Sequence, residues 1–84
     1  MSRALMLVED RTTADNIRAY VDPVQMWVGE IGGDFPAKKY EAIFVRYPSP
    51  NWFERRRVSP LEFSTFIRQQ VAGFLTPGST FQYI

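Results

Sequence analysis

Three consecutive arginines, Arg55-Arg56-Arg57, form the cluster with the clearest chemical potential in this 84-residue sequence. They follow Trp52 and Phe53. Guanidinium groups contact phosphates and aromatic rings stack on bases, so this combination is typical of nucleic-acid-binding surfaces. The residues of this candidate nucleic-acid surface are Arg46, Arg55, Arg56 and Arg57. Against it, the net charge is only +1 and the pI about 8.1, whereas nucleic-acid-binding domains usually exceed a pI of ~9.

The arginine run fits two further roles, which the sequence leaves open. On a strand, Arg56 points to the opposite side from Arg55 and Arg57, which suits a solvated edge strand where arginine discourages unwanted pairing. Alternatively, the run contacts an acidic protein surface, including the acidic half of a second copy. Residues 1–34 carry a net charge of −3 and residues 35–84 a net charge of +4, and arginine is favoured in planar contacts with carboxylates.

Catalytic chemistry finds little support, because the sequence contains no histidine and no cysteine. This removes the commonest general base, the thiolate nucleophile and any disulfide framework. Lys38 and Lys39 stand near no serine motif that would make a Ser-Lys pair. The available carboxylate pairs are Glu9 with Asp10, Glu30 with Asp34, and Glu41 with Glu54. Surface positions at turns and strand ends explain these pairs. The acidic residues that could supply oxygen ligands to a hard metal do not follow the spacing of a calcium loop; they are Asp10, Asp15, Asp22, Glu30 and Asp34. We therefore expect a protein that is not an enzyme, with no catalytic residues, cofactor or metal ligands.

Targeting signals are not evident in the sequence. The apolar run at residues 4–8 ends at Glu9 and Asp10, well short of the core of a signal peptide. No segment approaches the ~20 apolar residues that span a bilayer. Together with the lack of cysteine, this predicts a soluble cytoplasmic protein with no membrane partner.

The elements that position these residues belong to a single compact domain, residues 1–84. Strands are predicted at 3–9, 24–31, 39–47 and 52–58, and residues 80–84 are expected to form a short terminal strand or an apolar tail folded onto the sheet. The first is apolar on both faces, which places it inside the sheet. The second and third are joined through the glycine-rich loop at 32–34 and are expected to form a hairpin. Residues 13–21 predict a short helix capped by Thr12 or Thr13, with a strand as the alternative.

A second helix is predicted over about 60–75. Ser59-Pro60-Leu61-Glu62 has the pattern of a capping box with proline in the first turn. Downstream, the apolar residues recur at helical spacing and form one stripe. These are Phe63, Phe66, Ile67, Val71, Phe74 and Leu75. Pro77-Gly78 is expected to end the helix.

The sequence therefore predicts an α+β two-layer sandwich: a mostly antiparallel sheet of about four to five strands, covered on one face by the C-terminal helix. Thirteen aromatic residues either fill this thin core or leave an apolar face for a partner, where aromatic residues and arginine are enriched. We expect a small binding or adaptor protein that acts through protein–protein contacts, as a homodimer. The expected contact residues are Trp27, Tyr47, Trp52, Phe53, Arg55 and Arg57.

Overall fold

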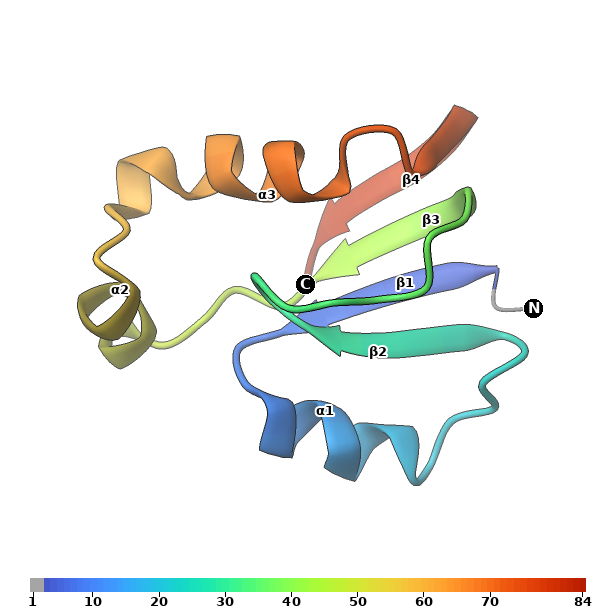
Figure 1. The fold of residues 1–84 in the computed structure, drawn as a ribbon, viewed down its shortest axis with the longest axis horizontal. Helices are drawn as coiled ribbons and strands as arrows, with labels where there is room; N and C mark the ends of the chain where they lie inside the picture. Colours follow the sequence, from blue (N-terminus) through green and yellow to red (C-terminus); the bar gives the residue numbers. More distant parts are fainter. Residues whose placement is uncertain (1–2) are drawn as a thin grey trace.

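All the strands of the sheet run in the same direction. The computed structural model describes residues 3–84, which form four strands and three α-helices. In chain order these are β1 (Ala4–Val8), α1 (Arg11–Arg18), β2 (Met26–Glu30), β3 (Tyr40–Val45), α2 (Pro50–Arg56), α3 (Phe63–Val71) and β4 (Leu75–Tyr83). The strand order is β2-β1-β3-β4, and each neighbouring pair is parallel (Figure 1). The predicted mostly antiparallel sheet is therefore wrong.

The predicted hairpin between residues 24–31 and 39–47 is also wrong, because β1 lies between β2 and β3. Ala4 of β1 is paired with Met26 on one side and with Ala42 on the other. The segment between β2 and β3 is thus a crossover rather than a tight turn, as its long path past the sheet shows (Figure 1). The interior position predicted for the first strand is confirmed. Buried parallel strands are apolar on both faces, which is the pattern β1 shows.

Helices cover both faces of the sheet, whereas the sequence predicted cover on one face only. Successive side chains of a strand point to opposite faces. Val8 and Val28 pack with Ala14 of α1 on one side. On the other side, Leu5, Leu7, Ile43 and Val45 pack with residues of α2 and α3. The predicted short helix is present as α1, but it begins at Arg11 and its N-cap is Asp10 rather than a threonine.

Residues 52–58, predicted as a strand, contain most of α2 instead. Pro50 stands in the first turn of this helix, where its fixed φ and missing N–H are tolerated. Consecutive residues of a helix lie about 100° apart, so Trp52 and Phe53 share its buried side. Their exposed fractions are 1% and 8%. A strand would have sent these two rings to opposite faces of the sheet.

Several of the aromatic residues pack against one another in a cluster around Trp52. The Trp52 ring lies edge-on to Phe53 and Phe63, with centroids 5.2 and 5.5 Å away. Tyr47 packs against Phe63 from the end of β3, at 5.1 Å. Edge-to-face pairs at such distances add to the stabilisation that burial gives. This cluster joins α2, α3 and the carboxyl ends of the strands into one core.

The C-terminal helix is shorter than predicted. Ser59 caps it as expected, with its Oγ accepting a hydrogen bond from the Leu61 N–H at 3.2 Å. The first turn, η1 (Pro60–Glu62), is a 3-10 helix, and α3 ends at Val71 shortly before Gly73, whose φ is 85°. Pro77-Gly78 lies within β4, where the register with β3 shifts. No helix formed by residues 3–84 is long and apolar enough to cross a membrane.

The buried position of Trp52 predicts a large effect of truncation. Trp52→Ala should lower the free energy of unfolding by about 3–5 kcal/mol, because it removes apolar contacts and leaves a cavity. The matched control is Tyr20→Ala, an aromatic truncation at a side chain that is 89% exposed, for which we expect a change within about 0.5 kcal/mol. Denaturant unfolding followed by circular dichroism measures both. Similar small effects for the two variants would contradict the placement of Trp52 in the core.

Candidate functional site

A polar pocket lies at the carboxyl ends of β1 and β3. In open parallel sheets, ligands bind beyond these ends where the strand order reverses direction. Here the chain reverses between β1 and β3, since β2 lies on one side of β1 and β3 on the other. The pocket has a volume of about 370 Å³. Its lining residues are Glu9, Asp10, Thr13, Arg46, Tyr47, Pro48 and Ser49.

Glu9, one of the two acidic residues of this pocket, holds the loop after β3. Glu9 accepts hydrogen bonds from the Ser49 N–H at 2.9 Å and from the Ser49 hydroxyl at 3.0 Å. Its other close contact is the Arg55 guanidinium, at 3.7 Å. Glu9 therefore fixes the loop after β3, and with it the start of α2, against the end of β1. Within residues 3–84, acidic side chains form no group of three or more suited to hold a metal ion.

Asp10 caps α1. Its carboxylate accepts a hydrogen bond from the Thr13 N–H at 2.7 Å. This hydrogen bond lowers the pKa of Asp10 below its ordinary value of 3.8, and a hydrogen bond with the Thr13 side chain makes a second, smaller contribution in the same direction. Both hydrogen bonds favour the charged carboxylate, as expected for an N-cap. The role that the structure gives to Asp10 is thus to start the helix.

The arginine run does not form one basic face. Arg55 faces Glu9, whereas the Arg56 guanidinium lies 3.4 Å from the Glu30 carboxylate at the end of β2. Arg57 follows α2 in the left-handed conformation, with a φ of 56°. Because Arg55 and Arg56 contact acidic residues at the ends of two different strands, the run does not present one continuous basic face. Two of the four candidate nucleic-acid residues are therefore engaged with acidic partners.

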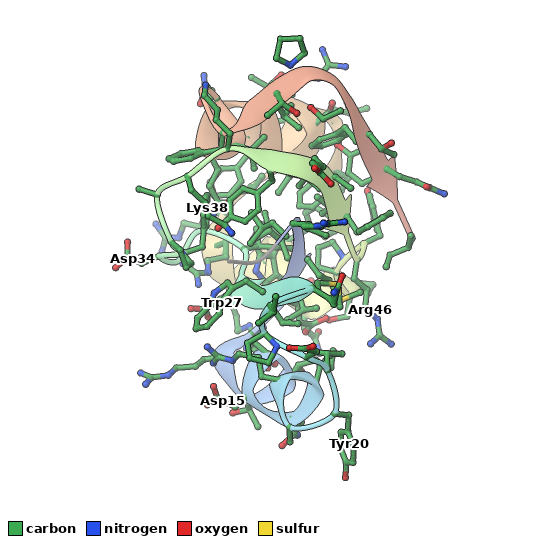
Figure 2. All side chains as sticks on the ribbon, turned by 90° about the vertical axis from the view of Figure 1, so that its right-hand side faces the viewer. Asp15, Tyr20, Trp27, Asp34, Lys38 and Arg46 are labelled. Carbon is green, nitrogen blue, oxygen red and sulfur yellow. The ribbon has the colours of Figure 1, made fainter. Side chains whose placement is uncertain are left out.

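Arg46, the fourth of these residues, is exposed and directly follows β3. Figure 2 shows Arg46 and Trp27 on opposite sides of the molecule. Arg46 follows Ala42 and Phe44 at the strand period of two. It therefore lines the pocket from the side on which α1 packs against β1 and β2. No acidic side chain within residues 3–84 forms an ion pair with it.

The six residues expected to contact a partner do not form one surface. Trp52 and Phe53 are buried, so the folded chain does not present them. Tyr47 is 52% exposed and covers Phe53, with ring centroids 5.6 Å apart. Trp27 lies on the edge strand β2 beneath the Arg18 guanidinium, whose central carbon is 5.0 Å from its ring. Tyr47 and Arg55 are brought near the same pocket, whereas Trp27 is held elsewhere.

A second candidate surface, which the sequence patterns did not single out, is the outer edge of β4. This strand has nine residues and none of them is charged. Edge strands usually carry charges or bulges that prevent pairing with other chains. A signal for this edge exists in the sequence, because residues 69–84 contain no charged side chain. The bulge at Pro77-Gly78 protects the first half of β4 and leaves residues 79–83 extended.

The free backbone groups on this edge follow from the pairing with β3. The Ile84 N–H donates to the Val45 carbonyl at 2.9 Å, and the Tyr47 N–H donates to the Ile84 carbonyl at 3.4 Å. Ile84 thus directs both backbone groups toward β3. Because these groups alternate in direction along a strand, those of Tyr83, Phe81 and Ser79 point to the open side.

An apolar pocket lies beside this edge. It has a volume of about 290 Å³ and is lined mostly by α3, by the turn after it and by β4. Its lining residues are Arg68, Val71, Ala72, Gly73, Leu75 and Phe81. The β4 edge therefore combines unpaired backbone groups with an apolar recess, the combination that strand-addition interfaces use.

The role of Asp10 as a cap predicts a pH-dependent contribution to stability. The folded-state pKa lies below the ordinary value of 3.8, so the contribution is present above that value and is lost as the pH falls through the folded-state pKa. Asp10→Ala should therefore lower the free energy of unfolding at neutral pH, and its deficit relative to the unmodified protein should shrink below pH 3.8. The control is Asp34→Ala, at an exposed loop position. Denaturant unfolding across this pH range measures both, and a deficit that does not change with pH would contradict the cap.

Comparisons with protein-family models, with curated proteins and with solved structures find no match for this chain. In the polar pocket at the strand ends, Glu9 holds a loop and Asp10 caps a helix, whereas the uncharged strand edge lies beside an apolar recess.

Proposed function

We propose that this protein is a non-enzymatic binding module that acts through protein–protein contacts, as a homodimer formed along the edge of β4. The observation that carries the proposal is the lack of any charged residue on this nine-residue edge strand. An exposed strand edge is a template for another strand, and charge is the usual protection against it. Two-fold dimers are also the commonest assemblies of soluble proteins.

A second copy suits this edge better than a charged partner. Two identical strands related by a two-fold axis run antiparallel and offer each other the same alternating donors and acceptors. No like charges face one another, because neither strand carries any. An acidic peptide or a nucleic acid would find no cationic side chain on β4. Arg55 and Arg56, which belong to the predicted nucleic-acid surface, already lie against Glu9 and Glu30.

The chemistry of the remaining chain supports a binding role rather than catalysis. The sequence lacks histidine and cysteine, and the carboxylates at the polar pocket are engaged by Ser49, Arg55 and Thr13. We further propose that the protein works in the cytoplasm, where a domain that folds on an apolar core without disulfides keeps its structure under reducing conditions.

The expected dimer is weak. A ladder formed by residues 79–83 of each copy is short, and its interface is small compared with the roughly 1,600 Å² of a standard stable complex. We therefore expect the dimer to dissociate on dilution, and its measurement requires a concentration series.

Charges placed on the edge should abolish the dimer. Light scattering of the unmodified protein should give a mass that rises from 9.8 kDa toward twice that value with concentration. The double variant Thr80→Lys/Gln82→Lys should stay monomeric, because its lysines face those of the second copy across the ladder. Both side chains are exposed, so we expect the fold to be retained.

The matched control is Thr65→Lys/Gln69→Lys, which makes the same changes at exposed positions of α3. It should dimerise like the unmodified protein. An unmodified protein that remains at 9.8 kDa at every concentration would overturn the proposal. A Thr80→Lys/Gln82→Lys variant that dimerises normally would overturn the placement of the contact at β4.

A further inference from the structure

The direction of the free backbone groups on β4 restricts how two edges can pair. We infer that the two copies pair about a two-fold axis at Phe81, so that Phe81 lies opposite Phe81 of the second copy; this inference rests on the proposed function. In an antiparallel ladder, a hydrogen-bonded pair forms only between two residues that both direct their N–H and C=O groups across the gap. On this edge those residues are Ser79, Phe81 and Tyr83, as the bonds of Ile84 to β3 indicate.

Among the registers that this rule permits, only the one centred on Phe81 gives each of Ser79, Phe81 and Tyr83 a partner that can both donate and accept. It pairs Ser79 with Tyr83 of the second copy, Phe81 with Phe81, and Tyr83 with Ser79. Each such pair exchanges two bonds, which gives about six across the interface. The neighbouring permitted register toward the bulge places Tyr83 opposite Pro77, which has no N–H to donate. The neighbouring permitted register away from the bulge, which places Phe81 opposite Tyr83, leaves Ser79 without a partner among residues 3–84.

The side chains agree with this register on both faces of the sheet. Phe81 belongs to the face covered by α3 and lines the apolar recess of about 290 Å³ there. The Phe81 ring of the second copy would lie against this recess, as an aromatic cross-strand pair. On the opposite face, Thr80 lies across from Gln82, and both side chains are polar and exposed. At the centre of the interface Phe81 thus meets Phe81 on one face, and Thr80 meets Gln82 on the other.

Cysteine cross-linking tests the register directly, because the chain contains no cysteine of its own. Thr80 and Gln82 of the second copy form a non-hydrogen-bonded pair, whose Cα atoms lie about 4.5 Å apart. This distance is within the range that a disulfide spans. The single variants Thr80→Cys and Gln82→Cys, one of them carrying a mass tag, are mixed in equal amounts and oxidised mildly. Gln69→Cys, at an exposed position of α3, is the control for random collision.

We expect the mixed Thr80→Cys with Gln82→Cys disulfide to exceed the sum of the two like-with-like products, which random pairing of equal amounts would only match. It should also exceed any product of Gln69→Cys by at least about tenfold. A dominant disulfide between two Thr80→Cys chains would move the axis to Thr80, and one between two Gln82→Cys chains would move it to Gln82. Either result, with a dimer seen by light scattering, overturns the register and leaves the proposed function standing. A protein that is monomeric at every concentration overturns both.

Discussion

The burial of β1 on both faces and both edges is the constraint on which the rest of the structure depends. Leu5 and Leu7 face α2 and α3, whereas Met6 and Val8 face α1. A strand that is apolar on two sides needs a cover on each, and its edges need a strand on each side. Parallel pairing with β2 and β3 meets both needs, because each parallel connection must cross over the sheet. The helices and the crossover at residues 31–39 therefore follow from the position of β1.

Parallel strands also decide where the polar residues meet. The carboxyl ends of β1, β2 and β3 lie on the same side of the molecule, and α2 lies beyond them (Figure 1). The charged groups there hold α2 in place: Arg55 faces Glu9 and Arg56 faces Glu30. Exposed ion pairs of this kind contribute little energy individually, and the buried rings of Trp52 and Phe53 attach α2 to the core. At the carboxyl ends of the strands, where a ligand would be expected, the charged side chains thus contact one another instead.

The same strand order leaves β4 with one neighbour only. Its inner side is paired with β3, and its outer side offers the backbone groups of residues 79–83. In a sheet of this kind an edge is unavoidable, and its side chains decide whether it stays free or pairs. Here the side chains are uncharged and the neighbouring recess is apolar. The features that favour a dimer are therefore the free backbone groups of β4 and its lack of charged side chains. An exposed aromatic face, which the composition suggested, is not among them.

Local patterns in the sequence locate most of the elements. The apolar run at 3–9, the cap at Ser59 and the helical stripe that follows it are such patterns, and β1 and α3 correspond to them. The helix at residues 52–58 could not be predicted in this way, because α2 has only seven residues, too few to show a helical period. Strand order and direction are fixed only when the strands assemble. The alternation of a strand is the same whether its neighbour runs parallel or antiparallel, so no local pattern shows which strand lies beside it, or which edge stays free.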